Sequence, residues 1–539
     1  MDGRGQRVMP LDPAWTSVGT DRVVLAVVHN VTSLTRLLDV VDLLTDDFRV
    51  QTVFTWTRSS VFTDGVAEFL ADIDAICIPW EEAKSAKFDL AISASYGGEL
   101  AALNCPLLVI SHGMGYNKYL TTTDVFGLSR PWLTHGGAVV PSAIVLSHPE
   151  QLLRLKEDCP EAVPVAVLAG DPCLDRMTAS LPWRRRYRQV LGVPEEARLV
   201  VVTSTWGRNS LFGDDPGLLG RLTDELPLDE YRVAAVLHPN VWHGHSAWQV
   251  RTWLDRARRS GLLVLPPRDG WRAALVAADV VIGDHGSVAF YGAVLGRPLL
   301  YATFPHDDVD VRSPVARLGV RGPKLDRTTP LADQLRAAIR DHSPDAYAEI
   351  LAEATSAPGE SAGLLRSELY RLMRLPEPQS AAAVRRVPEP TVPFAEPTAA
   401  LVSAAWRDGV VAVRRLPPTA PIPPGAHLVV DDAEDNARLF ELADVLTCRA
   451  DRLTDDPETW ARAALAARPS AVLACAEAPE GSLVAVRDGG CVMVRGGPPA
   501  LRPSAVHAWL ATGGDEHDIP DTCLVRAGEA SHRLRFTPR

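Results

Sequence analysis

Four polar or small residues, Asp284-His285-Gly286-Ser287, end an apolar run and carry the clearest chemical signal in the sequence. The run before them, DVVIG, predicts a buried strand, and the residues after them, VAFYGAVLG, predict a helix. Because a helix N-terminus has unpaired N–H groups and partial positive charge, it favours a bound phosphate. Gly286 would let a ligand approach the backbone, and Ser287 could cap the helix or donate its hydroxyl. An ordinary N-cap region is the equally consistent alternative.

Two histidines, His112 in SHGMG and His238 in LHPN, also follow apolar runs that predict strands. A histidine at such a position can act as a general base or hydrogen-bond a phosphate. For either residue taken singly, a purely structural role is the commoner explanation. The other candidates that follow predicted strands are Gly113, Lys118, Ser204, Thr205 and Arg208.

Two further clusters have residue types that bind metals. His238, His243 and His245 have a spacing seen among metal ligands, but they lie in a Trp-rich loop. The segment 306–310, HDDVD, could hold Mg²⁺ near phosphates, although a solvated acidic loop is the commoner explanation. We therefore expect no metal site and no required cofactor, with Mg²⁺ as the alternative.

Several enzyme classes lose support because their fingerprints are missing from the sequence. There is no GxGxxG dinucleotide motif, no GxxxxGK[ST] phosphate loop and no GxSxG nucleophile motif. The net charge of −12 argues against a general nucleic-acid-binding protein, which presents a basic face.

The cellular location follows from cysteine usage and hydropathy. The eight cysteines form no CxxC pair, which favours free thiols in a reducing compartment. The first residues lack a signal-peptide pattern, and no apolar run reaches the roughly 20 residues that span a bilayer. We expect a cytoplasmic protein that could still contact the inner face of the membrane peripherally.

The 539 residues predict two to four domains. Apolar runs alternate with helical patterns in two successive βαβ series, which predicts two doubly wound, Rossmann-like parallel-sheet units. We place the first at 1–175 and the second at 176–374. A proline-rich linker is predicted at 375–397, and an accessory α/β domain of unknown role at 398–539. Since ligands bind beyond the carboxyl ends of parallel strands, the candidate residues should face each other across a cleft.

The order of these motifs resembles the GT-B superfamily and, within it, the CDP-glycerol glycerophosphotransferase family of teichoic-acid polymerases and primases. The resemblance covers roughly residues 90–310. Three positions depart from the family pattern, because Met114, His285 and Gly286 stand where the family has Thr, Tyr and Ser. The motifs that carry the resemblance are His112-Gly113, Gly170-Asp171-Pro172 with Asp175, Ser204-Thr205-Trp206-Gly207-Arg208, His238-Pro239, Asp284 to Ser287, and Arg297-Pro298.

The resemblance implies a GT-B fold and transfer of a polyol phosphate, such as glycerol phosphate, from a CDP-activated donor. The acceptor would be a hydroxyl of a cell-envelope glycan or glycolipid. His112 would be the general base, while His238, Ser287 and the amides after Gly286 would bind the pyrophosphate. Lys118 and Arg208 would add positive charge near the phosphates, and Asp284 would orient the turn. The donor and phosphate side would also include Ser204, Thr205 and His285, while Gly113 and Lys118 would lie on the acceptor side.

Two other functions are compatible with the same motifs. A GT-B glycosyltransferase would use His112 as base toward the anomeric carbon of a UDP- or GDP-sugar. A catalytically degenerate module would keep only nucleotide binding or a partner interaction. The sequence makes no prediction of the oligomeric state or of the role of residues 398–539.

Overall fold

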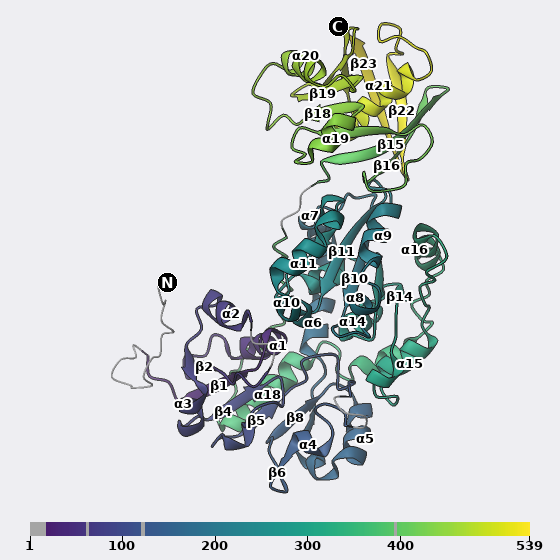
Figure 1. Ribbon diagram of the computed structural model, residues 1–539. Helices are drawn as coiled ribbons and strands as arrows, with labels where there is room; N and C mark the ends of the chain where they lie inside the picture. Colours follow the sequence, from purple (N-terminus) through teal and green to yellow (C-terminus); the bar gives the residue numbers. More distant parts are fainter. Residues whose placement is uncertain (1–17, 61–63, 120–123, 393–395) are drawn as a thin grey trace.

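The computed structural model describes residues 18–60, 64–119, 124–392 and 396–539. Three sheet-based units follow one another along the chain (Figure 1): a seven-stranded sheet, a five-stranded sheet and a closed barrel. All pairs in the first two sheets are parallel, so the predicted mixed α/β fold with two parallel-sheet units is confirmed.

The first sheet has the order β3-β2-β1-β4-β5-β8-β9. Successive residues of β1 point to different sides: Val24 and Ala26 lie in one buried cluster, and Leu25 and Val27 in another. A sheet with apolar cores on both faces explains the continuous branched residues of its strands. The strands are β1 (Arg22–Val28), β2 (Val50–Trp56), β3 (Cys77–Pro79), β4 (Leu90–Ser93), β5 (Leu107–Val109), β8 (Ala143–Leu146) and β9 (Ala166–Leu168).

Among its helices, α1 (Val31–Val41) packs against the sheet, and α5 (Pro149–Asp158) follows β8. Helix α18 (Ser361–Met373) comes much later in the chain but returns to this unit (Figure 1). Its Leu365 and Leu369 are fully buried in the cluster that contains Val24. The carboxylate of Asp175 accepts hydrogen bonds from the N–H groups of Gly359 and Ser361, which fixes the start of α18.

The second sheet has the order β12-β11-β10-β13-β14. Along β10, Leu199 and Val201 face one core, while Val200 and Val202 face the other. Its strands are β10 (Arg198–Ser204), β11 (Tyr231–Leu237), β12 (Leu263–Val264), β13 (Val280–Gly283) and β14 (Leu299–Tyr301). Its main helices are α6 (Pro172–Ala179), α7 (Arg184–Val190), α9 (Leu218–Glu225), α10 (Pro239–His245), α11 (Ala247–Trp253), α13 (Trp271–Ala277), α14 (Ser287–Val294), α15 (Pro314–Arg321) and α16 (Leu331–Arg340).

The proline-rich segment after α18 contains neither helix nor strand over residues 375–392. It is nevertheless held against the second unit, because the side chain of Val387 is fully buried there. The hydroxyl of Tyr187 also donates a hydrogen bond of 2.6 Å to the carbonyl oxygen of Val387.

The last unit is a closed nine-stranded barrel, which the sequence did not predict. The predicted α/β character is present in part of it, since three neighbouring parallel strands alternate with α19 (Ala437–Leu442) and α20 (Pro457–Ala467). Helix α21 (Arg502–Leu510) contacts β15, β16, β19 and β20. The strands are β15 (Ala399–Arg407), β16 (Val410–Leu416), β17 (His427–Asp431), β18 (Val445–Cys448), β19 (Leu473–Ala478), β20 (Gly481–Val486), β21 (Cys491–Arg495), β22 (Thr522–Ala527) and β23 (Ala530–Pro538).

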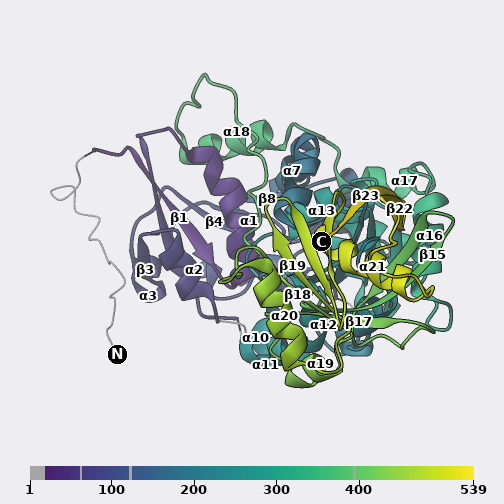
Figure 2. The same ribbon diagram turned by 90° about the horizontal axis from the view of Figure 1, so that it is seen from above.

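The barrel docks at the amino-terminal ends of the second sheet's strands. Arg415 makes a two-pronged ion pair with Asp229, just before β11, at distances of 2.8 and 3.0 Å. At the start of β10, Arg198 pairs with Glu529 of the barrel at 2.8 Å. Seen from above, the barrel overlies the second unit rather than the first (Figure 2). It therefore lies at the edge opposite the carboxyl ends, where ligands of parallel sheets bind.

The state of the cysteines and the apolar character of the helices were both predicted from composition. All eight cysteines carry free thiols, as predicted. In the part of the chain that the structure describes, no helix has the length and apolar character needed to cross a membrane.

Candidate active site

The loops that follow strands of the two sheets meet at the interface between the units. The ammonium of Lys118, after β5, donates a 2.8 Å hydrogen bond to the hydroxyl of Thr205, after β10. A Cβ added at Gly113 would lie 2.7 Å from Oγ of Ser287, the first residue of α14. Predicted residues separated by more than 80 positions in the sequence are therefore neighbours in one site.

A short backbone seam holds Lys118 beside the second unit. Lys118 forms an antiparallel bridge with Val309, and the N–H of Asp310 donates to the carbonyl of Asn117 at 2.8 Å. The fully buried carboxylate of Asp310 accepts hydrogen bonds from the Tyr119 hydroxyl at 3.2 Å and from Arg154 at 3.1 Å. This seam joins the loop after β5 to the segment after β14.

Met114 belongs to the same interface. Its side chain is buried in an apolar cluster that includes Ala289 and Phe290 of α14. An apolar side chain at this position therefore packs one unit against the other.

Asp284 organises the turn before α14. Its buried carboxylate accepts hydrogen bonds from the N–H groups of Thr205 at 2.8 Å, Leu211 at 2.9 Å and Gly286 at 2.9 Å. Burial raises the pKa of Asp284, whereas these N–H donors and the charge of Lys118 act to lower it. The side chain thus ties the loop after β10 to the start of α14.

Gly286 is the N-cap of α14 and has an extended backbone. A Cβ at this position would lie 3.0 Å from Oδ1 of Asp284 and 3.4 Å from Cβ of Thr205, so a side chain would crowd the turn. Gly286 has no side chain that could cap α14, and half-buried Ser287 follows it. The first-turn N–H groups of α14 can therefore bind an anion.

One hydrogen bond of the His112 ring fixes its tautomer. Its Nδ1 lies 3.1 Å from the carbonyl oxygen of Ala94, which can only accept, so Nδ1 carries the proton. Burial, with smaller contributions from Arg36 and Lys118, lowers the pKa of His112 to about 4, although the bond to Ala94 opposes this shift. The ring is therefore neutral at pH 7, and its Nε2 has a lone pair that can accept a proton.

His238 has the opposite tautomer. It is the N-cap of α10, and its Nδ1 accepts a 3.1 Å hydrogen bond from the N–H of Asn240. The proton of the neutral ring is consequently on Nε2. Burial, together with the charges of Lys118 and His112, lowers the pKa of His238 well below its usual range. His238 is thus a neutral hydrogen-bond donor at pH 7.

Of the remaining predicted residues, His285 and Ser204 are buried near the site, whereas Arg208 is exposed. His285 is buried, its Nε2 lies 3.9 Å from a carboxylate oxygen of Asp308, and burial lowers its pKa to about 3. The buried Ser204 hydroxyl donates to the carbonyl of Thr205 and accepts from the N–H of Phe212, both at 2.9 Å, so it supports the loop. Arg208 is exposed and takes no part in the contacts described above.

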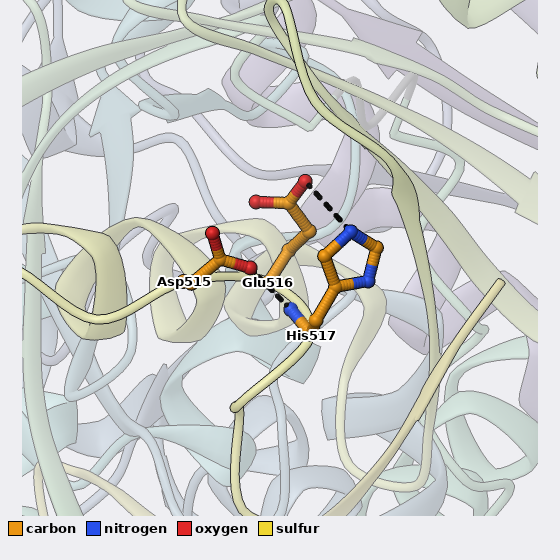
Figure 3. Close-up of side chains that lie close together, drawn as sticks. All are labelled: Asp515, Glu516 and His517. Carbon is orange, nitrogen blue, oxygen red and sulfur yellow. Dashed lines mark hydrogen bonds and ion pairs between the residues drawn. The ribbon is translucent and has the colours of Figure 1, made fainter.

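The proposed metal-ligand spacings do not converge in the described residues. Within the part of the chain that the structure describes, only Asp515, Glu516 and His517 of the barrel place three potential ligand atoms together (Figure 3). These side chains already serve the local turn: Glu516 accepts a 2.6 Å hydrogen bond from the N–H of Gly490, and Asp515 accepts from the N–H of His517. They lie in the barrel rather than between the two parallel sheets.

The structure adds two residues that the sequence argument missed. His29 is buried at the end of β1, its Nε2 donates to the carbonyl of Gly97 at 2.5 Å, and burial lowers its pKa to about 4. Its position directly after a predicted strand could have identified it as a candidate, as it did for His112 and His238. Arg36 in α1 is buried behind His112, and no local pattern marks it. It borders a small cavity of ≈ 20 Å³, about the size of one water molecule.

Comparison with known proteins gives a structural likeness only. No model of a known family and no curated protein matches the sequence. A structure of the wall teichoic acid polymerase TagF is similar at 11% identity, with a TM-score of 0.47, over 66% of this chain and 90% of that chain. A structure of that kind is therefore among the matches, as the motif resemblance predicted.

Two further structures show likeness at similar levels. The S. aureus MnaA–UDP structure has 11% identity and a TM-score of 0.40, over 67% of this chain and 100% of that one. UDP-GlcNAc 2-epimerase from Methanocaldococcus jannaschii has 9% identity and a TM-score of 0.42, over 65% of this chain and 99% of that one. At TM-scores below 0.5, these likenesses assign neither a donor nor an acceptor to this protein.

Proposed function

We propose that the protein transfers a polyol phosphate from a CDP-activated alcohol to a hydroxyl of a cell-envelope glycan or glycolipid. The observation that carries this proposal is the pairing of His112 and His238, two neutral histidines of opposite tautomer at one interface. Acceptor activation requires a proton acceptor, and departure of a nucleotide requires donors for the developing charge. The two rings supply one of each.

The donor pyrophosphate is proposed to bind the second unit at the start of α14. Its oxygens would accept hydrogen bonds from the first-turn N–H groups, from the Ser287 hydroxyl and from Nε2–H of His238. Lys118 would add a positive charge from the opposite unit, where it already contacts Thr205. Arg208 stays a predicted phosphate contact, since a bound donor could draw its exposed side chain inward.

His112 is proposed to act as the general base. The acceptor oxygen attacks the phosphorus that carries the polyol, and its proton moves to Nε2 of His112. The bond from this phosphorus to the bridging oxygen breaks, so CMP leaves with that oxygen. Lys118, His238 and the α14 terminus would stabilise the added charge on CMP.

A glycosyltransferase is the second candidate, because every role proposed above for a donor-site residue is directed at a pyrophosphate and none selects the transferred group. A UDP- or GDP-sugar would fit the same contacts, with His112 directed at an anomeric carbon. A degenerate module is less well supported, since it would not need His112 neutral with Nε2 as an acceptor.

We also propose that the transfer is independent of a metal and takes place at the inner face of the membrane. Lys118 places a cation beside Asp284 and Asp308, so we propose that transfer requires no metal, with Mg²⁺ as the alternative. A lipid-attached acceptor would be reached from the inner face of the membrane by a cytoplasmic protein in peripheral contact. We propose no nucleic-acid partner.

A thermal-shift screen tests the proposal. The ligands are CDP-glycerol, CDP-ribitol, CDP, UDP, UDP-N-acetylglucosamine, UDP-glucose and GDP-mannose. A ligand at 100 times its Kd stabilises the fold by about 2.7 kcal/mol. We expect the CDP compounds to stabilise the wild-type protein and to lose this effect in Ser287→Ala. The control Ser470→Ala, on the barrel surface, should be stabilised as much as the wild-type protein.

The alternatives give different results in the same screen. Preference for UDP- or GDP-sugars would favour glycosyl transfer. Equal stabilisation of the wild-type protein and Ser287→Ala by CDP-glycerol would remove the α14 terminus from the donor site. No response to any nucleotide would favour the degenerate module.

A further inference from the structure

A buried chain of hydrogen bonds connects the His112 peptide to α14. Nε of Arg36, in α1, lies 3.3 Å from the carbonyl oxygen of His112 and donates to it. The same guanidinium donates to the hydroxyl of Tyr291, which in turn donates to the carboxylate of Asp171 at 2.6 Å. Tyr291 lies four residues after Ser287 on α14. The buried guanidinium of Arg36 therefore contacts both the His112 peptide of the first unit and helix α14 of the second.

Acidic groups on two elements compensate the charge of Arg36. Its guanidinium lies 3.7 Å from Asp39 of α1 and 3.8 Å from Asp171. Asp39 also forms ion pairs with Arg176 of α6 and Arg272 of α13. The network therefore includes α1 of the first unit and α6, α13 and α14 of the second.

Asp171 is held rigidly at the junction of the units. It is the N-cap of α6, and its carboxylate accepts hydrogen bonds from the N–H groups of Cys173 at 2.9 Å and Leu174 at 3.0 Å. The hydroxyl of Tyr291 thus has a fixed acceptor and presents a fixed oxygen to Arg36. A buried ion network is weak evidence for stability but is well suited to fixing one geometry.

We propose that Arg36 is a positioning residue that ties the His112 peptide to Tyr291, so that the base and the donor-binding end of α14 keep one fixed separation. This inference rests on the proposed function of His112 and α14. Arg36 itself touches no reacting atom. The planar guanidinium suits the task, because its separate N–H groups reach a carbonyl and a hydroxyl at once.

The test compares Tyr291→Phe and Arg36→Lys with a matched control, Tyr370→Phe. Tyr370 is also buried and donates its hydroxyl to an aspartate, Asp47, at 2.7 Å, but it lies on α18 away from the site. With CDP-glycerol as donor, we expect kcat to fall at least tenfold in both test variants, with KM for the donor within twofold. Tyr370→Phe should leave both parameters unchanged. An equal loss of kcat in Tyr291→Phe and Tyr370→Phe would overturn the inference.

Hydrogen exchange provides a readout that does not depend on turnover. Amides in peptides covering residues 107–119 should exchange at least tenfold faster in Tyr291→Phe than in the wild-type protein, and at unchanged rates in Tyr370→Phe. Unchanged exchange in Tyr291→Phe would refute the positioning role whatever the kinetics show. If the wild-type protein turns over no nucleotide donor, the proposed function fails, while exchange still decides whether Arg36 and Tyr291 hold this peptide.

Discussion

The ammonium group of Lys118 donates a 2.8 Å hydrogen bond to the hydroxyl of Thr205 across the interface between the two parallel-sheet units. Burial lowers the pKa of Lys118, while the carboxylates of Asp284 and Asp308 act to raise it. A partly desolvated cation is thus placed on the loop proposed to contact the donor phosphates. The interaction requires both units, because neither alone contains both residues.

Replacing Lys118 with Met should weaken donor binding. Loss of one charge-assisted contact to a phosphate corresponds to about 10- to 100-fold lower affinity. Titration of CDP-glycerol followed by calorimetry measures this directly. Lys84→Met is the control, since Lys84 pairs with Glu81 and Glu99 on the surface of the first unit. Equal donor affinity in Lys118→Met and the wild-type protein would exclude Lys118 from the phosphate site.

The close approach of Gly113 to Ser287 predicts a coupled pair of substitutions. Gly113→Ala would place a methyl group 2.7 Å from Oγ of Ser287, so one of the two must move. We expect a destabilisation of about 1–3 kcal/mol in urea unfolding, as for other overpacked sites. Most of this loss should disappear when Ser287→Ala is already present, because the clashing oxygen is then removed. Strictly additive effects would show that the two positions do not touch.

Buried histidines predict a loss of stability in mild acid. Burial lowers the pKa of His29 to about 4 and those of His285 and His427 to about 3. Between pH 6.5 and these values the unfolded chain binds protons that the folded chain does not, so stability falls as pH decreases. Each group should cost about 1 kcal/mol between pH 6.5 and 5.5, measured by urea unfolding at both values.

Two variants control for this pH effect. His427→Gln should reduce the loss, whereas His135→Gln should leave it unchanged because His135 is exposed. Equal or greater stability of the wild-type protein at pH 5.5 would contradict the assignment of these histidines as neutral in the folded state.

The position of the barrel predicts that it is not part of the donor site. Arg415→Met breaks the ion pair with Asp229 at the amino-terminal edge of the second sheet. Exchange of amides near Leu228 should rise, because the N–H of Leu228 donates to the carbonyl of Arg415. Affinity for CDP-glycerol should stay within twofold of the wild-type value. A larger change in affinity would show that barrel docking influences the carboxyl edge.

Sequence patterns were sufficient to predict the two parallel sheets, because their strands are buried on both faces. Val24 to Val28 and Val280 to Ile282 are continuous branched or small apolar runs for this reason. The barrel was missed because its nine strands combine parallel and antiparallel pairs, and closure depends on contacts between distant strands. No local periodicity encodes the pairing of β16 with β22.

For the candidate site, too, some residues could be predicted from the sequence, and others could be found only from the packing of the two units. His112, His238 and Ser287 follow strands, so a rule about strand ends was enough to select them. The bond between Lys118 and Thr205 and the link from Arg36 to His112 depend on how the two units pack. Arg36 reads as an ordinary residue of an amphipathic helix, and only the structure shows that its guanidinium is buried behind the His112 peptide.

The most direct test of the account is the identity of the nucleotide product, followed by ³¹P NMR when CDP-glycerol is incubated with purified protein and envelope glycolipids. We expect the wild-type protein to release CMP. His112→Ala should bind CDP-glycerol with unchanged affinity and release CMP at least about 100-fold more slowly, the usual contribution of a general base. Release of CDP, or equal rates of CMP release by the two proteins, would contradict it.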